Sequence, residues 1–322
     1  MNGMRMVMRP INRRCFLGAT AGIIAAAGAS LAGDPPAPIV DPHFHVWDRK
    51  RLRLPWLDNA GALLNRDYSP GDYRDAIAGL NVVRSVYVEV AVDPSQHEAE
   101  ARFAAGLCGR SEAPVGGVVI GGRPGAEGFA NYIRQFKGNP CIRGVRAPFP
   151  AGRSRESRFV RDLALLGELQ LSFDLLLDAG EMAEAAELAK AARGTRFILD
   201  HCGNASCAWF APGGDNSAAD RWRKGTAALA AQPNVACKIS GVAENGPAAS
   251  ATIQNIAPIV NHCLDSFGPD RVMFASNWPV CLRSITIRGW VEVLREITAP
   301  RGKSFAEKLF NQNAVRHYRL LT

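Results

Sequence analysis

Histidines stand at the ends of two apolar segments of this chain, where they could bind a metal ion or take part in catalysis. His43 and His45 are separated by one residue in the run VDPHFH, and His201 directly follows the run FILD. Side chains at positions i and i+2 of a β-strand point to the same side, so the first two imidazoles could meet one divalent ion. Each histidine could instead be an ordinary polar residue at a strand end. The matching positions favour a metal or active-site role, with His201 as a third ligand or a substrate contact.

An acid and an arginine end two further apolar segments. Glu89 closes the run VYVE, where a carboxylate among apolar residues needs a partner or a role. We take it as a candidate metal ligand and general base; the alternative is a solvated Glu89, or one paired with an arginine such as Arg84. Arg146 closes the run IRGVR, and its planar guanidinium suits a substrate carboxylate. The alternative interpretation of Arg146 is that it forms an ion pair at the rim of the barrel.

Other residues near these positions could line a site. Lys238 and Ser240 share one side of a predicted strand, and we assign Ser240 to substrate binding. Trp47 and Trp278 are predicted to be walls of the substrate cavity rather than chemical groups. Asp200, next to the third histidine, would face the opposite side of a regular strand, so we assign it a structural role.

Eight apolar, β-rich runs alternate with amphipathic segments, and this alternation must position the polar residues above. The predicted strands are residues 39–45, 83–90, 115–120, 142–147, 172–177, 196–201, 235–240 and 271–276. The predicted helices are residues 98–107, 128–136, 159–169, 182–192, 222–231, 253–267, 287–297 and 305–318. Eight such units favour a single-domain (β/α)8 TIM barrel. A doubly wound sheet lacks support because no Gly-x-Gly-x-x-Gly follows an early strand. The loop of residues 49–70 is expected to cover the site.

The ordered series of short motifs resembles a known family. The motifs are Asp-x-His-x-His at 41–45, GVR at 144–146, FDLL at 173–176, LDHxG at 199–203, CKISG at 237–241 and FGPDRVMF at 267–274. Together they resemble the amidohydrolase-related (amidohydrolase 2 type), metal-dependent TIM-barrel hydrolases, which include sugar lactonases and pyrone-dicarboxylate lactonases. The resemblance extends over residues 39–318.

The resemblance implies a site lined by the three histidines, with or without a divalent metal, often zinc. It also implies a strand-8 aspartate, in a Ser-Asp-Trp-Pro setting, that acts as general acid and base. Here Asn277 stands at that position, between Ser276 and Trp278. An amide does not take up a proton near neutral pH. We therefore expect Glu89 or a bound water to move the proton, while Asn277 hydrogen-bonds the substrate or water.

The function implied is hydrolysis of a small lactone or related cyclic ester, carboxylated or sugar-derived, with metal assistance. Metal-free operation is also compatible with the pattern. Two alternatives stay open. One is a lyase of the same superfamily, a decarboxylase or hydratase; the other is a small-molecule-binding barrel without catalysis.

Composition excludes several other classes. With 47% apolar and 21% charged residues, the chain is an ordinary globular one. Half of its net charge of +8 lies in residues 1–32, which hold four arginines and no acid. The remaining positive charge is spread out and forms no basic run with aromatics, so nucleic-acid binding gets little support. No apolar stretch of the length of an ordinary spanning helix is present, so we expect no stable membrane insertion after signal removal.

Residues 1–32 are predicted to be an export signal, and residues 33–322 the barrel. Arg13 and Arg14 precede Phe16 and Leu17, an Ala/Gly-rich stretch follows, and small residues end the segment. The paired arginines resemble a twin-arginine signal, which implies a periplasmic protein.

Seven cysteines remain after the predicted signal, without a Cys-x-x-Cys spacing. Buried apolar roles are expected for them, with a Cys202–Cys207 bridge as an alternative. The sequence is compatible with a homo-oligomer.

Overall fold

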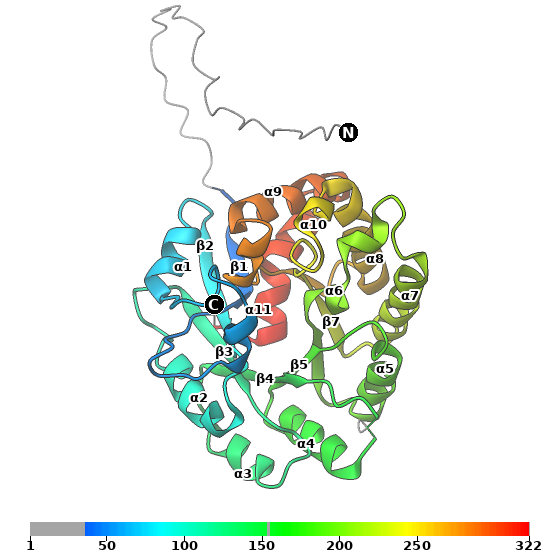
Figure 1. Ribbon diagram of the computed structural model, residues 1–322. Coiled ribbons are helices and arrows are strands. Elements are labelled where there is room, and N and C mark those ends of the chain that lie inside the picture. Colours follow the sequence, from blue (N-terminus) through cyan, green and yellow to red (C-terminus); the bar gives the residue numbers. More distant parts are fainter. Residues whose placement is uncertain (1–35, 153–154, 322) are drawn as a thin grey trace, which may run out of the picture. The chain divides into compact units, whose positions relative to one another are not determined.

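The predicted strands form one parallel sheet in which neighbours follow the order of the chain (Figure 1). The computed structural model describes residues 36–152 and 155–321. The strands are β1 (Ile39–Phe44), β2 (Val82–Val88), β3 (Val115–Gly121), β4 (Ile142–Pro148), β5 (Ser172–Leu176), β6 (Arg196–Leu199), β7 (Val235–Ile239) and β8 (Val272–Phe274). Every neighbouring pair is parallel, as crossover connections require.

The sheet closes on itself between β1 and the segment that follows β8. Phe44 and Trp278 form a parallel bridge. The amide of Asn277 donates to the carbonyl of His43 at 2.9 Å, and that of His45 donates to the carbonyl of Trp278 at 2.7 Å. The predicted TIM barrel is therefore confirmed.

Helices surround the barrel (Figure 1). They are α1 (Pro70–Ala76), α2 (His97–Ala105), α3 (Phe129–Arg134), α4 (Ser157–Glu168), α5 (Met182–Ala191), α6 (His201–Asn204), α7 (Asn216–Ala230), α8 (Ile253–Phe267), α9 (Ile287–Thr298), α10 (Lys303–Glu307) and α11 (Asn313–Tyr318). Shorter turns are η1 (Pro55–Asn59), η2 (Pro94–Gln96), η3 (Cys207–Phe210), η4 (Ala248–Ser250), η5 (Val280–Arg283) and η6 (Ala299–Arg301).

The long helices form because one face of each can be buried against the barrel. In α9 the buried residues are Ile287, Trp290, Val291 and Leu294, the i, i+3, i+4, i+7 spacing of one helical face. The predicted last helix at residues 305–318 is helical over its whole length. It contains a π-helical turn, η7 (Lys308–Gln312), between α10 and α11.

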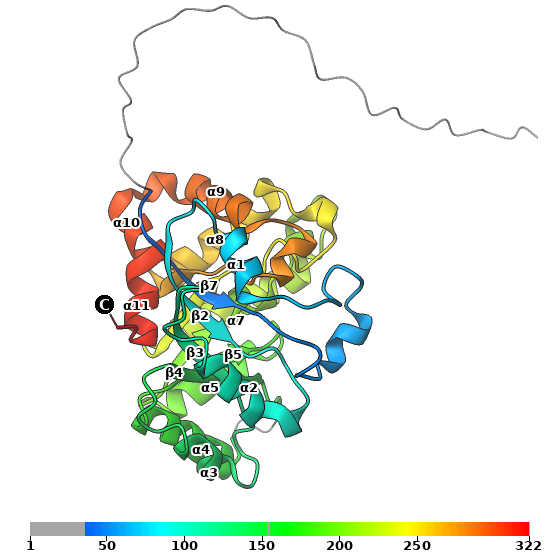
Figure 2. The ribbon, with the colours of Figure 1, turned by 90° about the vertical axis from the view of Figure 1, so that its left-hand side faces the viewer.

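Apolar side chains fill the amino-terminal half of the barrel, and α11 closes that end. The buried cluster there contains Val40, Val86, Val88, Val119, Ile198, Ala236 and Met273 from the strands, and Ala314, Tyr318 and Leu320 from the end of the chain. Figure 2 shows α11 on one side of the barrel and the segment after β1 on the other. Buried polar side chains of the strands, among them Asp174 and Lys238, lie above this cluster and next to Tyr318.

The predicted loop of residues 49–70 folds back onto that carboxyl-terminal end. Its base is held by Trp47 and Tyr68, whose backbones exchange hydrogen bonds of 2.9 and 3.0 Å. Its middle is held by Trp56, whose indole N–H donates to the carbonyl of Val90 at 2.8 Å.

The predicted signal at residues 1–32 lies outside the described residues. Across residues 36–152 and 155–321, none of the helices has the length and apolar character that a membrane span needs. The alternative Cys202–Cys207 bridge is not formed, since all seven cysteines of this part are free thiols. The Cys202 thiol lies within 4.8 Å of the Cys237 and Cys263 thiols instead.

Candidate active site

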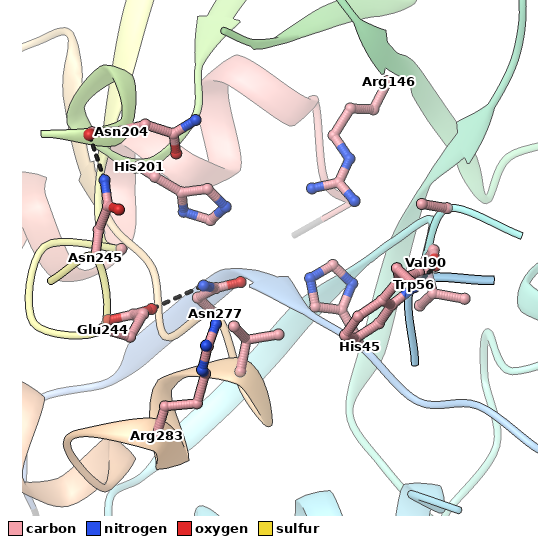
Figure 3. Close-up of a pocket in the computed structure, with 13 residues that line it drawn as sticks. His45, Trp56, Val90, Arg146, His201, Asn204, Glu244, Asn245, Asn277 and Arg283 are labelled. Carbon is pink, nitrogen blue, oxygen red and sulfur yellow. Dashed lines mark hydrogen bonds between the residues drawn. The ribbon is translucent and has the colours of Figure 1, made fainter. Parts of the chain in front are cut away.

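A cavity of about 280 Å³ lies at the carboxyl ends of the strands (Figure 3). Four residues singled out from the sequence line it: His45, Arg146, His201 and Asn277. Loop residues complete its wall, namely Trp56, Val90, Ala91, Asn204, Gly241, Glu244, Asn245, Val280 and Arg283. The barrel thus brings residues from separate strands to one site, as its topology requires.

His43 in β1 and His45, just beyond its end, face each other, as their spacing predicts. Nε2 of His43 lies 3.1 Å from Nε2 of His45. The carbonyl of Val88 lies 2.7 Å from Nδ1 of His45, so Nδ1 carries the proton and Nε2 presents its lone pair. Burial lowers the pKa of His45 to about 3. Burial, together with the positive charge of Lys238, lowers the pKa of His43 well below its usual range. Both imidazoles are neutral at pH 7, the form that binds metals.

His201 reaches the cavity because the chain leaves β6 in a left-handed turn. All four residues of α6 have positive φ angles, including 54° at His201 and 65° at Gly203. Two glycines make this possible. A Cβ at Gly203 would lie 1.8 Å from the side chain of Met182, and one at Gly241 would lie 2.4 Å from Cβ of His201. Burial lowers the pKa of His201 to about 4, so it too is neutral.

Ser240 holds His201 rather than lining the cavity. Its hydroxyl lies 2.9 Å from Nδ1 of His201, and its side chain is fully buried. The prediction that Ser240 binds substrate is therefore corrected to a positioning role. The alternation rule identified the correct side of β7 but could not show that the imidazole lies between Ser240 and the cavity.

Asp200 belongs to the site, contrary to the structural role assigned from the sequence. Its Oδ1 lies 3.5 Å from Nδ1 of His43, and its Oδ2 lies 3.6 Å from Nη1 of Arg146. The alternation argument failed because β6 ends at Leu199 and the backbone turns left-handed at His201. Both side chains can therefore face the same centre.

Lys238 is fully buried beneath the histidines and joins two carboxylates. Its Nζ lies 2.7 Å from Oδ2 of Asp174, 2.9 Å from Oδ1 of Asp200 and 3.2 Å from Nδ1 of His43. Burial alone would raise the pKa of Asp200, but Lys238 and His43 hold it well below its usual range. The hydroxyl of Tyr318 also donates to Asp174, at 2.5 Å, which ties α11 to the site.

Glu89 and Arg146 form a buried ion pair. Nε of Arg146 donates to Oε1 of Glu89 at 2.5 Å, and Nη2 donates to the Glu89 carbonyl at 2.6 Å. Oε2 of Glu89 accepts from the amide of Ala91 at 2.6 Å. Both carboxylate oxygens are thus engaged, so the structure shows an ion-paired Glu89, and its assignment as ligand and base stays a prediction. The remaining nitrogen of Arg146, Nη1, is directed toward the centre of the site and lies 3.4 Å from Nε2 of His43.

The segment around Asn277 is held by a buried carboxylate of β1. Asp41 accepts from the amide of Ser276 at 2.9 Å and from its hydroxyl at 2.6 Å. Burial raises the pKa of Asp41. These bonds join β1 to the end of β8 and place Asn277 at the cavity with a φ of 56°. Ser276, the residue before Asn277, therefore has a structural role: it ties the end of β8 to Asp41 of β1.

Glu244 is a site residue that sequence reasoning missed. It lies in the loop after β7 and lines the cavity, where its Oε1 accepts from Nδ2 of Asn277 at 2.7 Å (Figure 3). Burial raises its pKa to about 7, against the opposing effects of the Asn277 amide and Arg283. Its place in a loop, five residues beyond the end of β7, gave no strand-end signal.

The two tryptophans predicted as cavity walls lie behind the wall. Trp47 packs edge-on against Trp56 and Tyr68, with ring centroids 5.6 and 5.0 Å apart. Trp278 packs against Tyr68 and Tyr73 at 5.2 and 5.4 Å. Only Trp56 of the three tryptophans lines the cavity, so Trp47 and Trp278 are corrected to supports of the loop and of β1.

The residues present fit a divalent metal ion. Ligand atoms of His43, Asp200 and His201 all lie within 4.8 Å of one another. Neither oxygen of Asp200 accepts a hydrogen bond of good geometry from the described residues. The facing nitrogens of His43 and His45 need a proton or a cation between them. Neutral imidazoles with an ionised carboxylate are a donor set found at catalytic zinc sites.

Known proteins resemble this chain over most of its length. It is 28% identical over 292 residues to an L-fucono-1,5-lactonase of Burkholderia multivorans, covering 87% of this chain and 96% of that protein. A crystal structure of a Burkholderia multivorans amidohydrolase with bound HEPES superimposes with a TM-score of 0.78 at 26% identity, covering 88% of this chain and 100% of that one. A crystal form of a Burkholderia multivorans amidohydrolase with bound zinc gives a TM-score of 0.76 at 24% identity, with the same coverage, and shows the shared fold.

The family model described as Amidohydrolase (Amidohydro_2) matches residues 40–320, which is nearly the whole described barrel. The match includes every strand from β2 to β8 and both histidines of β1. The chain therefore belongs to the amidohydrolase family and is a hydrolase with a TIM-barrel fold.

Proposed function

We propose that this protein opens a small lactone or related cyclic ester, carboxylated or sugar-derived. The observation that carries the proposal is the cavity itself, in which neutral imidazoles, Arg146 and a carboxyl group surround a volume of about 280 Å³. That volume suits a single ring rather than a polymer. The lactonase name of the Burkholderia multivorans relative supports the same substrate class.

The arginines of the cavity would bind and orient the substrate. Nη1 of Arg146 is directed at the centre, while its other two nitrogens are fixed by Glu89. Arg283 lines the cavity from η5 and offers a second cation. Two guanidinium groups can hold a carboxylate or the ring hydroxyls of a sugar lactone. Trp56, anchored to Val90, forms part of the cavity wall and would offer an apolar surface to the substrate ring.

His43, Asp200 and His201 would hold a divalent ion, with His45 beside them, and we propose zinc. When bound, such an ion supplies Lewis-acid polarisation of the lactone carbonyl. Lys238 and Ser240 hold the proposed ligands Asp200 and His201 in place through the contacts at 2.9 Å described above.

The test is turnover on a panel of sugar lactones and carboxylated pyrones, with ring opening followed by NMR. We expect hydrolysis of at least one member, with zinc in the purified protein by elemental analysis. Release of carbon dioxide without ring opening would show a lyase instead. Stabilisation by a lactone without turnover would show a binding protein and overturn the proposal.

We also propose that the protein is exported to the periplasm. The support is the arginine pair at residues 13–14 ahead of Phe16 and Leu17. Fractionation of cells that express the full chain tests this proposal.

A further inference from the structure

We propose that Glu244 is the general acid and base of this site and that Asn277 is its positioning residue. The inference rests on the proposed lactone hydrolysis. The proton-transfer group would then come from the loop after β7 rather than from the end of β8.

Geometry distinguishes Glu244 from the other acids near the centre. Glu244 lines the cavity, whereas Glu89 is paired with Arg146 and the amide of Ala91. Asp200 lies beside Lys238 and is better suited to hold an ion. Among the described residues that line the cavity, Glu244 is the one carboxylic acid.

The contact with Asn277 explains why an amide suits position 277. Nδ2 of Asn277 donates to Oε1 of Glu244 at 2.7 Å, which fixes the carboxyl group at the cavity wall (Figure 3). An aspartate there would bring two carboxylates within hydrogen-bond distance, and one of them would have to stay protonated. Asn277 and Glu244 therefore form a matched pair.

The surroundings of Glu244 are consistent with proton transfer near neutral pH. The charged or titratable groups around it are Arg283 from η5, the thiols of Cys202, Cys207 and Cys281, and His45, Arg146 and His201 on the same cavity. Burial favours the acid, while the hydrogen bond from Asn277 and the charge of Arg283 favour the carboxylate, which leaves the pKa of Glu244 at about 7. A base of that pKa works well at physiological pH.

The chemical step balances as follows. The Glu244 carboxylate takes a proton from water while the water oxygen bonds to the lactone carbonyl carbon. The tetrahedral adduct then breaks its bond to the ring oxygen, and Glu244 returns the proton to that oxygen. One water is consumed, the product is a hydroxy acid, and Glu244 ends as a carboxylate.

Glu244→Gln removes the titrating proton while keeping size and hydrogen-bonding capacity. We expect kcat to fall about 10²–10⁴-fold, the range for a general acid or base, with KM and metal content little changed. The matched control is Glu292→Gln on the exposed face of α9, which should leave activity unchanged. A Glu244→Gln variant within threefold of wild type would overturn the proposal.

The pH dependence of kcat/KM distinguishes a proton-transfer role of Glu244 from a purely structural role in the cavity wall. Wild-type kcat/KM should fall as the pH drops below about 7, because the base becomes protonated, and Asn277→Asp should move this limb to higher pH. An acidic limb that stays in place in Asn277→Asp, or that survives in Glu244→Gln, would contradict the role given to Glu244.

A second measurement keeps the inference testable if no lactone is opened, which would refute the proposed function by itself. Carbon-13 NMR of glutamate-labelled protein should show a carboxyl group that titrates near pH 7, is missing in Glu244→Gln and moves upward in Asn277→Asp. Without that signal the proton-transfer role of Glu244 is overturned, whatever the substrate.

Discussion

Lys238→Met should strongly destabilise the barrel. The side chain of Lys238 is fully buried, with Nζ 2.7 Å from Asp174 and 2.9 Å from Asp200. At an effective dielectric constant of about 20, each contact is an attraction of about 6 kcal/mol, which desolvation of the ions largely offsets. Methionine keeps the volume of the side chain but removes the cation between the two carboxylates, and Asp200 is left with only the longer 3.6 Å contact to the cation of Arg146. Breaking a buried pair in this way costs about 3–5 kcal/mol.

The assay is urea unfolding at pH 7, followed by circular dichroism, of wild type, Lys238→Met and the control Lys190→Met on the exposed side of α5. A loss of about 3–5 kcal/mol corresponds to a fall in Tm of roughly 6–20 °C. Adding Asp174→Asn to Lys238→Met should recover part of the loss, because one unpaired charge disappears. A Lys238→Met loss below about 1 kcal/mol would refute the reasoning.

The loss should also depend on pH. The folded pKa of Asp200 is held below its unfolded value of about 3.8, so its stabilisation is present above that pH and disappears as the pH falls through the folded pKa. Without Lys238 this contribution is missing at neutral pH. The difference between wild type and Lys238→Met should therefore shrink once the pH falls below about 3.8. A difference that stays constant below that pH would count against an ionic origin.

Three further changes have defined outcomes. The double variant His43→Ala, His45→Ala should lose bound metal and turnover while keeping the circular dichroism spectrum of the barrel; full turnover by demonstrably metal-free wild type would make the histidines substrate contacts. Arg146→Lys keeps the charge but loses the planar fork, so kcat/KM should fall by the equivalent of about 1–3 kcal/mol, and an unaltered value would place Arg146 outside the site. Changing Arg13 and Arg14 to Lys should leave the protein in the cytoplasm with its signal attached, whereas unchanged export would argue against a twin-arginine signal.

Local pattern was sufficient to predict the elements and the histidine pair. α8 begins at Ile253 and ends at Phe267, as its apolar spacing predicts, because burial of one helical face repeats every three to four residues. His43 and His45 meet because strand side chains alternate, a property that depends on neighbouring residues only. The barrel topology then follows from eight successive strand–helix units.

Partners that are distant in the sequence were decided by the tertiary structure alone. Glu89 could be a ligand, a base or half of an ion pair, and only the fold brings Arg146 to within 2.5 Å of it. Asp200 faces the centre because the chain turns left-handed at His201, and this turn needs space beside Gly241 in the segment after β7.

Glu244 is the clearest example of a residue whose role could not be predicted from the local sequence. Its sequence neighbours give it neither a strand end nor an apolar run, so local pattern assigns it no role. Its proximity to Asn277 and its partial burial arise when β7 and β8 come together. The sequence by itself determined which elements form and which strand ends carry polar groups. The tertiary structure decided which of these groups form hydrogen bonds or ion pairs and which line the same cavity. These contacts depend on distances between strands, which are set only in the closed barrel.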